Sequence, residues 1–133
     1  FISSNVGAVH AFAETVGAWF DTPHGVANSL FLPYIMEFNI PACPERFADI
    51  ADAMGIEREE SMSDEQYALK AVEYVKALNR KLNIPTIKEI KGITEERFEA
   101  IAERSANNVL SNDNARKITK EDYLELLKKA YNE

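Results

Sequence analysis

The segment GAVHAFAETVGAWFDTPHGVANSLFLPYIMEFN, residues 7–39, contains both histidines of this 133-residue chain. Apolar side chains recur along it at helical spacing, and Pro23 interrupts the pattern near its middle. This pattern predicts one helix at about 3–19 and a second at about 23–38. Thr22 is the expected N-cap of the second helix, with Pro23 at its first helical position.

The rest of the chain also has helical periodicity, which predicts an all-α fold, a helical bundle. Five glycines and five prolines interrupt the sequence, and no stretch shows the sustained alternation of a β-strand. Pro33 is expected to bend the second helix, because its ring clashes with the carbonyl four residues earlier. We find no internal repeat or linker, so residues 1–133 are expected to form a single domain. Further helices are predicted after Pro44, from the Ser63–Asp64 cap to Ile84–Pro85, from Thr94, and in the final TKEDYLELLKKAYNE, with a polar loop at SNDNAR.

Composition limits the possible functions. A chain that is 46% hydrophobic and 28% charged is typical of globular proteins, and its net charge of −7 argues against a nucleic-acid surface. The lone Cys43 cannot form an internal disulfide, so the cytoplasm is the expected compartment. His10 and Glu14 interrupt the apolar start, which therefore fits neither a signal peptide nor a membrane span. Because the chain opens on Phe1 within a hydrophobic pattern, we expect it to be part of a larger protein.

His10 and His24 are candidate metal ligands. On a helix, His10 shares one stripe with Gly7, Glu14 and Gly17. Glycine costs about 1 kcal/mol relative to alanine inside a helix, so the two glycines suggest that a ligand approaches the backbone here. His24 lies near the start of the next helix, where the dipole favours a neutral imidazole suited to a metal. If the two helices fold back as a hairpin, the imidazoles can converge.

Two histidines do not complete a site, and another interpretation is open. A metal usually takes three or four protein ligands, so the others must come from outside this chain or from carboxylates. In the alternative, both histidines are hydrogen-bonded core residues of a stand-alone helical interaction module.

Residues 7–39 resemble the signature of the iron-dependent, or group III, alcohol dehydrogenase family. Its G-x-V-H-A and P-H-G motifs have counterparts here, as does the pattern from Asn28 to Asn39. The later agreement is looser and lies at Ile84–Pro85, Asn114, Arg116 and Thr119 to Asp122. The resemblance covers the helical C-terminal domain of this family, whose architecture is shared by dehydroquinate-synthase-like proteins, a third possible assignment.

The resemblance implies the metal-binding part of an enzyme that interconverts alcohols and aldehydes or ketones by metal-assisted hydride transfer. His10 and His24 would be ligands of Fe(II), or of Zn(II), together with an aspartate and a third histidine from upstream polypeptide. NAD(P) would be bound mainly by an N-terminal α/β domain outside this chain, so the isolated fragment would be inactive. The full-length enzyme would act on a small alcohol or aldehyde and is expected to be a homo-oligomer.

Two further site residues are carried over from the resemblance. Glu14 stands where many members have a histidine near the nicotinamide, and could order water, orient His10 or relay the alcohol proton. Phe1 stands where an aromatic residue often lines the substrate pocket.

Overall fold

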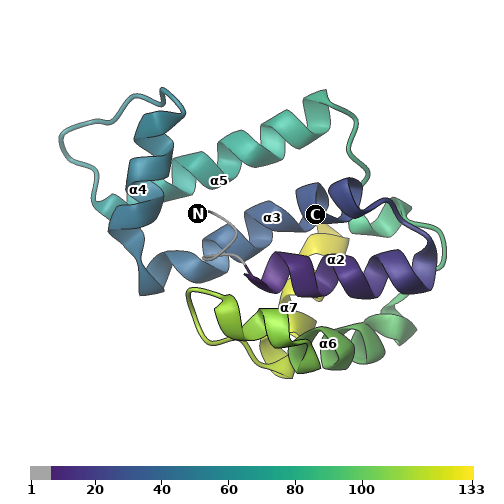
Figure 1. Ribbon diagram of the computed structural model, residues 1–133. Coiled ribbons are helices and arrows are strands. Elements are labelled where there is room, and N and C mark those ends of the chain that lie inside the picture. Colours follow the sequence, from purple (N-terminus) through teal and green to yellow (C-terminus); the bar gives the residue numbers. More distant parts are fainter. Residues whose placement is uncertain (1–6) are drawn as a thin grey trace.

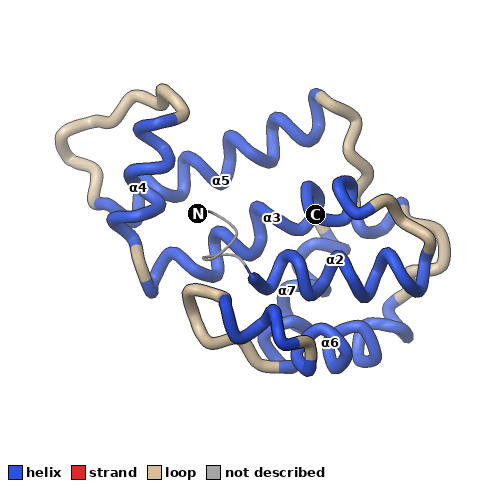
Figure 2. The backbone as a smooth tube through the Cα atoms, viewed as in Figure 1, coloured by secondary structure: helices blue, strands red, loops and turns tan. Residues whose placement is uncertain are grey.

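The computed structural model describes residues 7–133, which contain α-helices and short 3-10 helices and no β-strand (Figures 1 and 2). The predicted all-α fold is thus confirmed, whereas Phe1 lies outside the described residues. The α-helices are α2 (Gly7–Phe20), α3 (His24–Asn39), α4 (Pro44–Ala53), α5 (Asp64–Lys81), α6 (Phe98–Asn107) and α7 (Lys120–Asn132). The 3-10 helices are η1 (Ile40–Ala42), η2 (Ile87–Glu89), η3 (Glu95–Arg97) and η4 (Val109–Asp113). No helix among residues 7–133 is long and apolar enough to cross a membrane.

Helix α3 lies in the middle of the bundle, between α2 and α5 (Figure 1). One apolar cluster joins α2, α3, α6 and α7, and within it Phe12 stacks on Phe31 with 4.0 Å between ring centroids. A second cluster joins the end of α3 to α4 and α5 around Phe47 and Tyr67. Because both clusters include α3, the packing of both fixes the position of this helix.

Several helix ends have well-defined capping interactions, and the one at Ser63 is the predicted cap. The Ser63 hydroxyl accepts the Gln66 backbone N–H at 3.2 Å, and the Gln66 side chain accepts the Ser63 N–H at 3.0 Å. Thr119 and Asp122 form the same reciprocal arrangement at the start of α7. After α4, Gly55 takes the left-handed conformation with φ of +80°, which other residues rarely adopt. These signals are local, which is why the sequence reveals them.

Other boundaries differ from the sequence-based expectation. Helix α3 begins at His24, with Pro23 at the N-cap position and no side-chain cap. The Thr22 hydroxyl instead donates to the Phe20 carbonyl at 3.5 Å, within the turn. The helix expected from Thr94 begins as η3 before α6, and η4 extends into the expected SNDNAR loop. Short 3-10 turns lack the long periodicity from which helices are predicted.

Helix α3 continues through Pro33 because another side chain replaces the missing donor. Proline has no N–H, so the carbonyl of Ser29 cannot receive its usual bond from four residues onward. The Asn79 side chain of α5 donates to this carbonyl at 2.7 Å. Asn79 therefore satisfies a backbone group that Pro33 leaves open and joins α5 to α3.

Residues that carry the family resemblance near the C-terminus have a structural role. The side-chain amides of Asn39 and Asn114 pair reciprocally, with hydrogen bonds of 3.0 and 2.7 Å. Asn114 also donates to the Arg116 carbonyl, and the Arg116 guanidinium donates to the Phe38 carbonyl at 3.0 Å. Asn39 is completely buried. The pair fastens the end of α3 to the segment after η4.

Candidate metal centre

The two histidines of the chain lie next to each other, as the hairpin interpretation requires. His10 is on α2 and half-buried, and His24 is the exposed first residue of α3. Their ring centroids are 6.0 Å apart and their planes differ by 20°. The turn at residues 21–23 makes this possible because it ends α2 and redirects the chain; Asp21 has a left-handed φ of 52°.

This separation suits two ligands of a single ion. A metal lies about 2.0–2.1 Å from a ligating imidazole nitrogen, which places the centres of two rings on one ion about 5–6 Å apart. The interpretation as packing histidines does not describe His24, because its side chain is exposed and belongs to neither apolar cluster. Among residues 7–133, no group of three or more His, Cys, Asp or Glu side chains is placed to hold a metal. The pair could supply two of the three or four ligands that a metal usually takes.

Glu14 lies one turn after His10 on α2, and its side chain is exposed. Residues four apart on a helix share a face, so Glu14 is on the same side of α2 as His10. It forms no ion pair or hydrogen bond with a described residue. A carboxylate in this position can reach solvent and the space in front of His10.

The glycines of α2 face the backbone of the chain itself. A Cβ added at Gly7 would lie closer than 3.0 Å to the Leu110 carbonyl oxygen, and one at Gly17 would lie 3.3 Å from the Thr22 carbonyl. The expectation that they leave room for a ligand was therefore wrong. Gly7 allows α2 to pack on η4, and Gly17 allows the turn to close. Gly25 has nothing within 4 Å of an added Cβ and leaves open space beside His24.

Two buried hydroxyl groups, those of Ser111 and Tyr123, lie against the start of α2. The Ser111 hydroxyl donates to the Ser105 carbonyl at 2.6 Å and shares a 2.6 Å hydrogen bond with the Tyr123 hydroxyl. The Tyr123 hydroxyl also lies 3.4 Å from the Ala8 carbonyl of α2, which is an alternative acceptor for its single proton. Burial raises the pKa of Tyr123 to about 12, although the hydrogen bond with Ser111 opposes the rise. These contacts hold the helix that carries His10 against α7 and the segment after α6.

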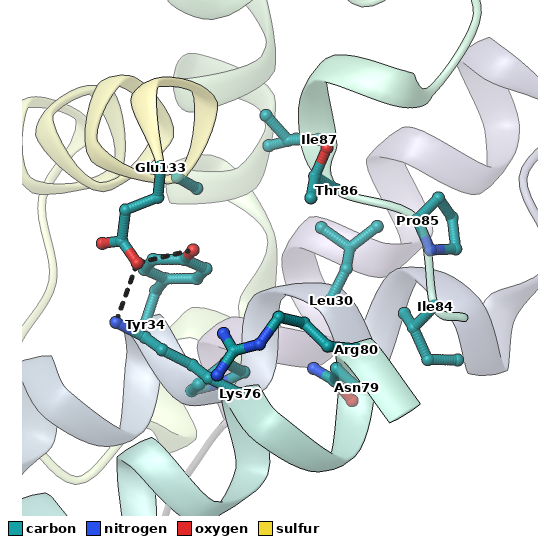
Figure 3. Close-up of a pocket in the computed structure, with 12 residues that line it drawn as sticks. Leu30, Tyr34, Lys76, Asn79, Arg80, Ile84, Pro85, Thr86, Ile87 and Glu133 are labelled. Carbon is teal, nitrogen blue, oxygen red and sulfur yellow. Dashed lines mark hydrogen bonds and ion pairs between the residues drawn. The ribbon is translucent and has the colours of Figure 1, made fainter. Parts of the chain in front are cut away.

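A separate cavity of about 260 Å³ lies between α3, α5, η2 and α7 (Figure 3). Glu133 lies beside Lys76 and Tyr34 at one side of the cavity (Figure 3), and it accepts hydrogen bonds from them at 3.0 and 3.4 Å. Burial and the Glu133 carboxylate raise the pKa of Tyr34 to about 12. Neither His10 nor His24 lines this cavity. It is therefore distinct from the candidate metal centre.

Comparison with known proteins agrees with the family resemblance seen in the sequence. The model of the Fe-containing alcohol dehydrogenase family, C-terminal, matches residues 1–131. The chain belongs to the iron-containing alcohol dehydrogenase family. It is 39% identical over 131 residues to the lactaldehyde reductase of Escherichia coli (strain K12), covering 98% of this chain and 34% of that protein. It is 34% identical, with the same coverage, to the 1,3-propanediol dehydrogenase of Citrobacter freundii.

Solved structures of iron-type alcohol dehydrogenases have the same helical arrangement. The alcohol dehydrogenase from Oenococcus oeni matches with a TM-score of 0.87 and 40% identity, over 96% of this chain and 33% of that chain. A 1,3-propanediol oxidoreductase matches with a TM-score of 0.85 and 34% identity, over 92% of this chain and 32% of that chain. This member of the family thus spans about one third of the length of these relatives and corresponds to their helical C-terminal part.

One residue near the centre was not singled out from the sequence. Asn28 lies four residues after His24 in α3, and its side-chain oxygen is buried without a hydrogen-bond partner among the described residues. The available signal was a polar residue within an apolar helix, at the spacing that places it on the same face as His24.

Proposed function

We propose that this chain is a single metal-binding domain of an NAD(P)-dependent, iron-type alcohol dehydrogenase. His10 and His24 supply two ligands of a divalent metal, and the remaining ligands come from polypeptide outside this chain. The observation that carries the proposal is the 6.0 Å separation of the two imidazole rings. Family membership supports the activity, the interconversion of alcohols with aldehydes or ketones.

The residues present fit such a metal. Imidazole nitrogens bind iron and zinc, so the pair accommodates Fe(II) and also Zn(II). The chemistry that a divalent metal supplies when bound here is Lewis acidity toward the oxygen of an alcohol or carbonyl. His24 is the first residue of α3 and His10 lies on α2, and these helices place the two imidazole ring centroids 6.0 Å apart. The nicotinamide cofactor would be bound mainly by polypeptide outside this chain.

Glu14 is proposed to take part in proton transfer during the reaction. Its exposed carboxylate on the His10 side of α2 can order water or accept the proton that an alcohol loses when its carbon gives up hydride. With two histidines here and two ligands from elsewhere, the metal has its usual complement without Glu14. Glu14 is therefore assigned to tuning turnover and not to binding metal.

The deciding experiment measures metal content and activity in the complete protein that contains this chain. His10→Ala and His24→Ala are each expected to lose the bound metal and the alcohol-dependent reduction of NAD(P). Arg80→Ala, on the exposed surface of α5, serves as the control and should retain both. Full metal content in both histidine variants would refute the assignment.

The 133-residue chain alone should be inactive and bind metal weakly. Two neutral histidines leave most of the coordination shell to water. Titration with Zn²⁺ by calorimetry should show little heat at micromolar concentrations. Tight one-to-one binding would mean that carboxylates of this chain complete the site. The homo-oligomer and cytoplasmic location expected from the sequence stay predictions.

A further inference from the structure

Asn28 has the only buried side-chain nitrogen or oxygen among residues 7–133 that lacks a hydrogen-bond partner. Its Oδ1 is shielded from solvent and accepts no hydrogen bond from the part of the chain that the structure describes. More than about 90% of buried polar groups in proteins have a partner, and leaving one without costs about 1–3 kcal/mol. A cost of this size suggests that Asn28 Oδ1 accepts a hydrogen bond in another state of the protein, in which a donor lies within reach.

The position of Asn28 on α3 indicates which donor that is. Asn28 follows His24 by four residues, so the two side chains lie on one face with Cβ atoms about 5–6 Å apart. Side chains of a helix point back toward its N-terminus, so the Asn28 amide extends toward the turn that carries His24. The imidazole of His24 donates no hydrogen bond to a described residue. One unused acceptor and one unused donor therefore share the face of α3 at the candidate centre.

We propose that Asn28 is a positioning residue of the metal centre. When one ring nitrogen of His24 binds the metal, the other donates its N–H to Asn28 Oδ1. Metal-ligating histidines almost always give their second N–H to an acceptor, which fixes the tautomer and the ring orientation. This inference rests on the proposed function, since it requires His24 to be a ligand.

An amide is well suited to this task at this place. Asn28 Oδ1 is a neutral acceptor, so it orients the imidazole without adding negative charge beside the ion. The unsatisfied oxygen thus lowers the stability of the metal-free protein. This loss would be offset in the metal-bound protein, where the His24 ring N–H donates to Asn28 Oδ1.

The test compares metal affinity with stability in the complete protein, with Zn²⁺ as the probe. Asn28→Leu removes the acceptor at similar volume, and its Zn²⁺ affinity, measured by chelator competition, should fall by about 10- to 100-fold. The unfolding temperature of the metal-free protein should stay unchanged or rise, because an unsatisfied buried oxygen has been removed. Asn107→Leu, at an exposed position of α6, is the matched control and should change neither.

A second readout observes the hydrogen bond itself. In the Zn²⁺ form, proton NMR should show a slowly exchanging ring N–H of His24, and this signal should be lost in Asn28→Leu. Asn28→Asp, which keeps an acceptor oxygen, should retain the signal and most of the affinity. The Asp variant also keeps the test usable if the Leu variant fails to fold, since its missing N–H signal would contradict the proposal.

The outcomes separate this inference from the function on which it rests. Unchanged Zn²⁺ affinity in Asn28→Leu would overturn the role of Asn28. So would a loss of affinity matched by a lower unfolding temperature of the metal-free protein, because that result describes a structural residue. If His24→Ala keeps the Zn²⁺ affinity of the unsubstituted protein, the metal centre itself is wrong, whatever the result at position 28.

Discussion

Gly7→Ala should destabilise the fold strongly for so small a change. An added Cβ would approach the Leu110 carbonyl oxygen within 3.0 Å and would lie 3.0 and 3.1 Å from two atoms of Asp113. Leu110 and the Asp113 carbonyl carbon belong to the backbone of η4, so rotation of a side chain cannot relieve the contact. We expect α2 and η4 to move apart, at a cost of about 2 kcal/mol, which is within the range measured for overpacked cores.

The matched control is Gly25→Ala. Position 25 is exposed on α3, and an added Cβ there meets nothing within 4 Å. Alanine at a compatible helical position stabilises a protein by about 0.4–1 kcal/mol, largely by restricting the unfolded chain. The two substitutions add the same methyl group to two helices, yet they are expected to change the free energy of unfolding in opposite directions.

Urea unfolding followed by circular dichroism would measure both free energies, and thermal unfolding would check them. For a chain of this length, about 2 kcal/mol corresponds to a fall of roughly 8 °C in Tm for Gly7→Ala. Because Gly7 precedes His10 by three residues on α2, the same displacement should weaken metal binding in the complete protein. A Gly7→Ala variant as stable as Gly25→Ala would refute the explanation by close backbone approach.

Three further predictions concern other residues. Asn79→Ala should lower the free energy of unfolding by about 1–2 kcal/mol, because it leaves the Ser29 carbonyl without a donor. Adding Pro33→Ala should recover much of this loss, since alanine restores the backbone N–H, and a double-mutant cycle by urea unfolding would measure the recovery. The free energy of unfolding should fall as the pH rises from 10 to 12, and Tyr123 should contribute about 2 kcal/mol of this fall, since the folded state holds its proton with a pKa of about 12 against 10.0 in the unfolded chain. Tyr123→Phe should make that fall shallower, and an equal fall would contradict the assignment. Glu14→Gln in the complete protein should retain metal but lower kcat and alter one limb of the pH–rate profile; lost metal would make Glu14 a ligand.

The approach of the histidines could be predicted from the sequence because its causes are local. Pro23 separates two apolar helical patterns, and a short turn between helices brings them back together. The meaning of Gly7 could not be predicted in the same way, since its neighbour Leu110 is more than a hundred residues away in the chain. A glycine in a helix indicates that something lies close to the backbone, and only the fold shows whether that is a ligand or the protein.

The asparagines also show what a sequence leaves open, because it does not reveal which of their amides are hydrogen-bonded. Asn39 and Asn114 are recognisable as parts of a family pattern, but a sequence does not show that their amides pair across 75 positions. The side-chain oxygen of the same residue type at position 28 is buried and has no hydrogen-bond partner among residues 7–133. In one case the amide closes a structural contact and should be needed by the metal-free protein. In the other case, at Asn28, the unsatisfied amide oxygen lowers the stability of the metal-free protein. A gain of stability when Asn28 is replaced would therefore indicate that the residue is present for function and not for the fold.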